Sequence, residues 1–340
     1  MKLSFETITQ IAKGVSYISK EEEGIQFHRF NKTEEEYYSN SSWPRRYTTS
    51  GVKLVFLTDS TTLKLKVNVK EGTPTRYFSH DIFCDNKYIG SLRNFRDEDL
   101  PIKVDEKTLL PMGDFRFGVF EETFNLGKGT KEISIVFPWS VISILEELTV
   151  DDGANVSAVN TEFRMISYGD SITYGASTLF PSNRYAAKIS NDFGLEEICK
   201  GVGGEIFCPK LLDTEKEEKI KYVTVAYGTN DLGKDFEDFQ NRCSEFYEKI
   251  SKLYFDAIIF ALSPIWRKDC ESGENFEKFN KIRKYIKEIA SRHDNIIFID
   301  GSNFVPSDIN LYADKVLHPN DEGMEHYYKG LKVKLHKFIK

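Results

Sequence analysis

The chain has 340 residues, of which 40% are hydrophobic and 29% charged, so its composition supports a packed core and excludes wholesale disorder. Its 53 acidic residues outnumber its 46 lysines and arginines, and the net charge of -7 predicts no general attraction to nucleic acid or to an anionic membrane. No apolar run reaches the ~18 residues of a transmembrane helix, and residues 1–24 lack the apolar stretch of a secretory signal.

The five cysteines include no CxxC pair, which predicts neither a disulfide framework nor a structural zinc site. Together with the missing targeting signals, this cysteine usage favours a cytoplasmic protein. The length corresponds to about two domains of ~150 residues each.

The first half of the chain has the pattern of short β-strands. Apolar residues alternate with polar ones in 61–69, and the Asp59-Ser60 pair just before this segment is a turn signal. No helical pattern of comparable length interrupts these segments, so we expect an all-β sandwich. The expected strands are 51–58, 61–69, 79–89, 115–124, 131–137 and 142–150.

The pattern changes after a polar, turn-forming segment at 151–155, which we take as a linker between domains 1–155 and 156–340. Strand-like and helix-like segments then alternate, which predicts an α/β domain with a parallel sheet covered on both faces. The expected strands are 163–167, 197–200, 222–226, 257–262 and 295–299, and the expected helices are 236–253, 275–293 and 321–338.

Three polar blocks follow predicted strands, and a fourth precedes the last predicted helix. The first three are 168–175 (YGDSITYG), 201–205 (GVGGE) and 227–231 (YGTND), and the fourth is 314–321 (DKVLHPND). In a parallel α/β sheet, ligands gather outside the carboxyl ends of the strands. We therefore expect these blocks to form one site.

The blocks contain the residue types that acyl transfer requires. A serine on a tight strand-to-helix turn, such as Ser171, is an exposed nucleophile, a histidine such as His318 accepts its proton, and a carboxylate fixes the imidazole tautomer. Glycine N–H groups and an asparagine amide can hold the developing oxyanion. Taken singly, Asp170-Ser171 is also a common helix cap and Asn230-Asp231 a common turn. Their occurrence together favours a catalytic site.

In order and spacing, the blocks resemble those of the SGNH (GDSL-type) hydrolase superfamily. Gly169-Asp170-Ser171 resembles the nucleophile block, Gly204 the oxyanion glycine, Gly228-Thr229-Asn230-Asp231 the GxND block and His318-Pro319-Asn320 the histidine block. The resemblance covers residues 160–340 and implies a flavodoxin-like, three-layer α/β/α domain. Residues 1–155 resemble, more weakly, the jelly-roll-like β-sandwich that precedes the hydrolase domain in a two-domain branch. That branch includes acetyl-polysaccharide esterases and acyltransferases.

The resemblance implies that Ser171 is the nucleophile, that His318 is its base and that Asp314 orients the imidazole. The family spaces the acid and the histidine as DxxH, whereas here Lys315 stands at that position and the nearest upstream acid is Asp314, in a DxxxH arrangement. A loop can absorb one residue, so Asp314 is the expected acid. A backbone carbonyl, which some family members use instead, stays open as the alternative.

The expected oxyanion hole consists of the Ser171 N–H, the Gly204 N–H and the Asn230 side-chain amide. Gly203 is the alternative to Gly204. We prefer Gly204 because it directly precedes the acidic Glu205, as the family glycine tends to precede a small polar or acidic residue.

These features predict a serine esterase that hydrolyses small acyl esters through an acyl-enzyme, with O-acetyl groups on a carbohydrate as the best single substrate class. The expected partner is a small acyl ester such as an acetylated saccharide, with no cofactor, no metal, no nucleic acid and no membrane; a homo-oligomer stays open. An acyltransferase that uses the same residues is the main alternative. A carbohydrate-binding protein with an inactive hydrolase half is a remote one, because Ser171, Asn230 and His318 are all present.

Overall fold

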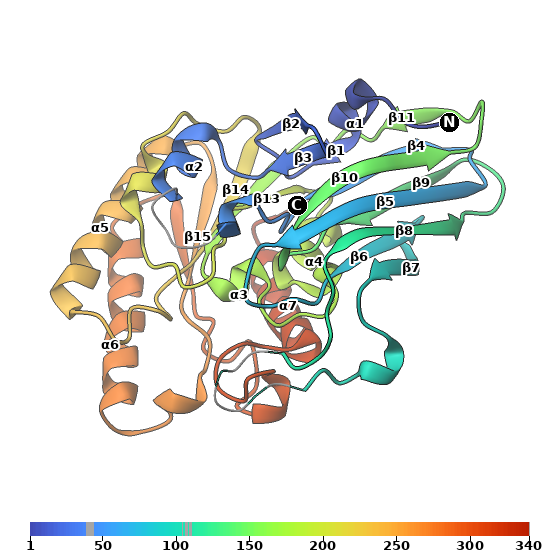
Figure 1. Cartoon of the computed structure of the whole chain (residues 1–340). Coiled ribbons are helices and arrows are strands. Elements are labelled where there is room, and N and C mark those ends of the chain that lie inside the picture. The colour runs from blue at the N-terminus through green and yellow to red at the C-terminus, as the bar shows by residue number, and fades with distance from the viewer. Residues whose placement is uncertain (39–43, 104, 106–107, 109–110, 340) are drawn as a thin grey trace. The chain divides into compact units, whose positions relative to one another are not determined.

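The computed structural model describes residues 1–38, 44–103, 105, 108 and 111–339. Contacts divide the chain into two compact units (Figure 1). The first comprises Met1–Asn160 and Leu179–Ser182, and the second comprises Thr161–Thr178 and Asn183–Lys340. Within the described ranges, none of the helices combines the length and the apolar character needed to cross a bilayer.

The first unit contains two antiparallel sheets. One has the strand order β1-β4-β9-β6-β7, with β11 also paired to β4, and the other has the order β2-β3-β10-β5-β8. Their bounds are β1 Ala12–Lys13, β2 Tyr17–Glu21, β3 Gly24–His28, β4 Lys53–Thr58, β5 Thr62–Glu71, β6 Ser79–Cys84, β7 Lys87–Arg93, β8 Gly118–Asn125, β9 Lys131–Val136, β10 Val141–Val150 and β11 Val156–Ala158.

Alternation along the strands explains why the two sheets pack together. Leu63, Leu65, Val67 and Val69 on one face of β5 are fully or almost fully buried, whereas the lysines between them are partly exposed. They share one core with residues of β4 and β9 in the other sheet. Burying one face of each sheet against the other is the physical basis of a sandwich, so the predicted all-β sandwich is confirmed.

Two local features of this unit differ from the sequence-based expectation. Residues 79–89 form a hairpin of β6 and β7 rather than one strand, because Asp85 and Asn86 turn the chain with φ of 47° and 61°. Such consecutive positive φ values are typical of a two-residue hairpin turn. The short helices α1 (Phe5–Ile11) and α2 (Lys32–Tyr38) have only 7 residues each, which is too short for a clear helical period.

The segment Leu179–Ser182 belongs to the first unit although it lies between two segments of the second. The Ser182 N–H and hydroxyl both donate to Asp81 Oδ2, at 3.0 and 2.6 Å. The Phe180 ring packs edge-on against Phe95 at a centroid distance of 5.9 Å. Side chains of β6 and the loop after β7 therefore hold this segment.

The second unit is built on a parallel five-stranded sheet with the order β13-β12-β14-β15-β16. Numbered within the unit, this order is 2-1-3-4-5, which defines the flavodoxin-like arrangement. The predicted α/β fold with a parallel sheet is therefore confirmed. The strands are β12 Arg164–Gly169, β13 Glu196–Cys199, β14 Ile220–Ala226, β15 Ile258–Leu262 and β16 Ile296–Ile299.

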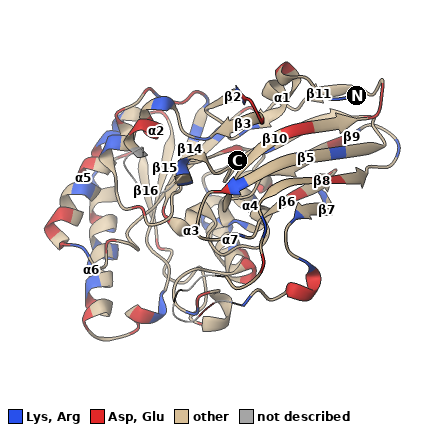
Figure 2. Cartoon of the chain, in the orientation of Figure 1, with Lys and Arg blue, Asp and Glu red and all other residues tan. Residues whose placement is uncertain are grey.

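Helices cover both faces of this sheet and make the two outer layers of the unit. The helices α5 (Phe236–Leu253) and α6 (Gly273–Ala290) share a core with Tyr168, Val225 and other strand residues. On the opposite face, α4 (Tyr185–Asp192) and α7 (Asp321–Leu335) share a core with Met165 and Phe260. The outer surfaces of α5 and α6 carry charges of both signs (Figure 2). This distribution fits solvent-facing helices with i,i+4 ion pairs such as Glu248–Lys252.

Candidate active site

The chain turns sharply where β12 ends, and Ser171 begins the short helix α3 (Ser171–Tyr174) at this turn. A Cβ on Gly169 would lie 2.1 Å from Thr173 Oγ1, so only glycine fits there. The Asp170 side chain caps the helix by accepting the Ile172 N–H at 2.9 Å. The Gly-Asp-Ser order is thus explained by the turn itself, which presents the serine directly after the strand.

The structure brings Ser171, His318 and Asp314 into one chain of hydrogen bonds. Ser171 Oγ lies 2.8 Å from His318 Nε2, and His318 Nδ1 lies 2.7 Å from Asp314 Oδ2. Because a carboxylate only accepts, Nδ1 carries the proton and Nε2 accepts from the serine hydroxyl. The serine is 7% exposed and the histidine side chain 27% exposed, so the nucleophile is buried and its base is half-buried.

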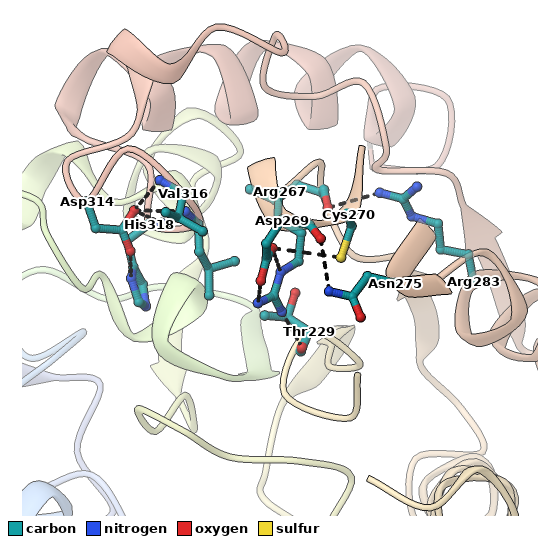
Figure 3. Close-up of polar contacts among 11 residues, drawn as sticks. Thr229, Arg267, Asp269, Cys270, Asn275, Arg283, Asp314, Val316 and His318 are labelled. Carbon is teal, nitrogen blue, oxygen red and sulfur yellow. Dashed lines mark hydrogen bonds and ion pairs between the residues drawn. The ribbon is translucent and has the colours of Figure 1, made fainter. Parts of the chain in front are cut away.

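The loop before α7 shows how the DxxxH spacing is accommodated. Asp314 Oδ1 accepts the backbone N–H groups of Val316, Leu317 and His318 at 2.9, 2.8 and 3.1 Å, while Oδ2 faces the imidazole (Figure 3). The extra residue, Lys315, takes a left-handed conformation with φ of 61°. The loop therefore winds around one carboxylate oxygen and leaves the other for the histidine.

This environment keeps Asp314 ionised. Burial acts to raise the pKa of Asp314, but the hydrogen bond and charge of His318, together with the Leu317 and Val316 N–H groups, outweigh burial and hold the pKa below its ordinary value. A carboxylate at this position stabilises the Nδ1–H tautomer of His318 and any positive charge that develops on the ring.

Asp170, beside the serine, behaves in the opposite way. Its side chain is buried, and this burial raises the pKa of Asp170 to about 7, against the lowering effect of the Ile172 N–H and of the His318 charge. A carboxyl group that changes charge near neutral pH therefore lies directly next to the serine.

Of the two expected oxyanion donors beyond Ser171, Asn230 contacts the loop that contains Gly204. Asn230 Nδ2 donates to the Glu205 carbonyl at 2.9 Å, and Gly204 is exposed with φ of 83°. Among the described residues, no hydrogen bond connects either of them to Ser171. In the same block, Asp231 is anchored to α5 by Arg242 at 2.8 Å, and burial raises the pKa of Asp231.

One residue that contacts these blocks was not selected from the sequence. Arg267 follows β15 and donates through Nη1 to the Thr229 carbonyl at 2.8 Å. Its position directly after a parallel strand is typical of a site residue. However, an arginine in a loop is too common for this position alone to select it. In the described part of the chain, no cluster of three or more His, Cys, Asp or Glu side chains is arranged to hold a metal ion.

Residues 167–326 match the model of the GDSL-like Lipase/Acylhydrolase family. No curated protein sequence matches the chain.

Among solved structures, the salicylyl-acyltransferase SsfX3 from a tetracycline biosynthetic pathway is similar, with a TM-score of 0.82 and 18% identity over 99% of this chain and 97% of that chain. A GDSL-like lipase from Bacteroides ovatus has a TM-score of 0.70 and 18% identity over 97% and 96% of the two chains. A family two carbohydrate esterase from Cellvibrio japonicus has a TM-score of 0.63 and 13% identity over 100% and 98%.

These structural likenesses extend over both units of the chain. At such low identities they show a shared two-part fold and not a shared substrate. The family match and the strand order therefore identify residues 167–326 as a GDSL-like lipase/acylhydrolase domain.

Proposed function

We propose that this protein is a serine acylhydrolase in which Ser171, His318 and Asp314 form the catalytic triad. The observation that carries the proposal is the continuous hydrogen-bonded chain from Ser171 Oγ through the imidazole to Asp314, at 2.8 and 2.7 Å. The order of these groups matches the roles of nucleophile, base and orienting acid in acyl transfer.

In the first half of the reaction, Ser171 Oγ attacks the carbonyl carbon of the ester while His318 Nε2 takes the hydroxyl proton. The tetrahedral intermediate then collapses, the bond between carbon and the alcohol oxygen breaks, and His318 returns the proton to the leaving alcohol. The acyl group stays on Ser171 as an ester.

In the second half, His318 removes a proton from a water molecule that attacks the acyl-enzyme. The bond to Ser171 Oγ breaks, and His318 returns the proton to the serine as the free acid leaves. The negative charge of each intermediate would be held by the N–H groups of Ser171 and Gly204 and by the Asn230 amide. Asn230 Nδ2 has two hydrogens, and its bond to the Glu205 carbonyl uses one of them.

For the substrate, we propose a small acyl ester, with an O-acetyl group on a saccharide as the preferred class. The fold shared with a family two carbohydrate esterase over 100% of this chain supports this choice. The second candidate is an acyltransferase, supported by the TM-score of 0.82 to a salicylyl-acyltransferase over 99% of this chain. The two differ only in whether water or another nucleophile reaches the acyl-enzyme.

Hydrolysis of p-nitrophenyl acetate and of acetylated oligosaccharides by the wild type and Ser171→Ala tests the proposal. We expect the wild type to release acetate and the variant to release none above background. Ser291→Ala, which changes an exposed serine at the end of α6, is the matched control and should keep wild-type rates. Equal turnover by Ser171→Ala would reject the mechanism, and acyl transfer to an added alcohol in preference to water would identify the acyltransferase.

A further inference from the structure

Arg267 lies at the centre of a cluster of polar contacts close to the candidate site. Its Nη1 donates to the Thr229 carbonyl at 2.8 Å, and its Nε and Nη2 donate to the two carboxylate oxygens of Asp269 at 2.6 and 2.7 Å (Figure 3). The Arg267 side chain is only 12% exposed. The bidentate pair with Asp269 fixes the plane of the guanidinium, so Nη1, the one nitrogen that does not bond Asp269, is directed at the Thr229 carbonyl.

The carbonyl that Arg267 holds belongs to the peptide bond between Thr229 and Asn230. Fixing this peptide plane fixes the position of the Asn230 Cα, from which the side chain extends. At its other end, the Asn230 amide donates to the Glu205 carbonyl at 2.9 Å. Gly228, which precedes Thr229, has φ of 112°, a conformation that residues other than glycine rarely adopt. Because glycine can take many backbone conformations, contacts from other residues must hold this turn in one of them.

The same segment also reaches the loop that carries Asp314. The N–H of Lys268, the residue after Arg267, donates to the Val316 carbonyl at 2.9 Å. The Val316 N–H in turn donates to Asp314 Oδ1 at 2.9 Å. The consecutive residues Arg267 and Lys268 thus connect the block 227–231, which contains Asn230, with the loop 314–318.

This segment is itself anchored to α6. Arg283 donates through Nε and Nη2 to the carbonyls of Pro264 and Ile265, at 3.1 and 3.0 Å, and Asn275 Nδ2 donates to the Asp269 carbonyl at 3.1 Å (Figure 3). Arg267 therefore acts from a fixed position, which is a requirement for a residue that is to hold another one in place.

We propose that Arg267, clamped by Asp269, is a positioning residue that holds Asn230 in the geometry needed to stabilise the oxyanion. This inference rests on the proposed acylhydrolase function. It adds that rate enhancement depends on a contact outside the four sequence blocks, made to a backbone carbonyl rather than to substrate.

The test is a double-mutant cycle between Arg267→Met and Asn230→Ala, with kcat and KM measured on p-nitrophenyl acetate. The rate at which a fluorophosphonate labels Ser171, followed by intact mass, is the second readout and requires no natural substrate. Arg292→Met is the matched control because Arg292 is exposed in the turn after α6 and, in the described contacts, its side chain pairs only with Glu288. Asp269→Asn weakens the clamp without removing the arginine.

We expect Arg267→Met to lower kcat about 10- to 100-fold with KM little changed, the range typical of a lost supporting contact. In the Asn230→Ala background the same change should cost less than about 3-fold, because the residue it positions is gone. Asp269→Asn should give a smaller loss of kcat, and Arg292→Met none. Labelling of Ser171 should slow in parallel with kcat.

Two results separate this inference from the proposed function. If Arg267→Met loses the same factor with and without Asn230, or keeps wild-type kcat and labelling, Arg267 does not act through Asn230 and the inference is wrong. If the wild type neither hydrolyses esters nor is labelled at Ser171, the acylhydrolase function itself is wrong.

Discussion

Asp314→Asn is the substitution that tests the catalytic geometry most directly, because the two oxygens of Asp314 do different things. Oδ1 accepts three backbone N–H groups at 2.8 to 3.1 Å, and Oδ2 accepts from His318 Nδ1 at 2.7 Å. Asparagine keeps one oxygen and replaces the other with an NH₂ group of nearly the same size. Its orientation therefore decides the outcome.

The asparagine oxygen should remain on the three backbone N–H groups. The opposite orientation would place an NH₂ group against three donors and lose three hydrogen bonds, each worth about 0.5–1.5 kcal/mol, to keep one. The NH₂ group then faces His318 Nδ1, which must become the acceptor, so the proton moves to Nε2. In that tautomer the histidine no longer accepts the Ser171 proton, and a serine-protease triad with this same change loses about 10⁴ in kcat. We expect a loss of 10³–10⁴ with the loop still folded.

The assay is kcat for p-nitrophenyl acetate together with the melting temperature and the ¹⁵N shifts of His318. Asp308→Asn is the control, since Asp308 Oδ1 also accepts a backbone N–H (from Asn310, at 2.9 Å) in a nearby exposed loop. Asp314→Asn should melt within a few degrees of this control and show the Nε2–H tautomer. Activity within about 10-fold of wild type would refute the reasoning and favour a backbone carbonyl as the group that orients His318.

Two further predictions concern Asn230 and Asp170. Asn230→Ala should lower kcat by roughly 10²- to 10³-fold, the cost of losing one oxyanion donor. An unchanged kcat would show that other groups stabilise the oxyanion. Asp170→Asn keeps the capping oxygen but removes a carboxyl whose pKa burial raises from 3.8 to about 7. The stabilising contribution of Asp170 is complete below pH 3.8 and is lost as the pH rises through about 7. Because asparagine does not ionise, the free energy of unfolding of the variant should rise relative to that of the wild type by on the order of 2–4 kcal/mol between pH 5 and pH 8. A constant difference in melting temperature would contradict this assignment.

Much of the fold could be predicted from the sequence because local patterns carry it. Alternation along 61–69 predicted β5, and α5 spans the same residues, Phe236–Leu253, as its helical period predicted. The hairpin at Asp85-Asn86 was missed although this pair is a turn signal, because its two residues lie within an otherwise continuous strand pattern.

For the candidate site, the sequence by itself determined which residue types stand at the ends of which strands, and in what order. Their spacing in the chain reflects strand and helix lengths, so the four blocks could be recognised without coordinates. The sequence could not decide whether a DxxxH loop brings its carboxylate to the histidine.

The tertiary structure decided that question, because it depends on how the loop winds. Lys315 takes a left-handed turn, and Asp314 divides its two oxygens between the backbone and the imidazole. The structure alone also joined Arg267 to the Thr229 carbonyl across 38 positions of sequence. A hydrogen bond between a side chain and a distant backbone carbonyl leaves no periodic pattern in the sequence, since any residue can supply that carbonyl.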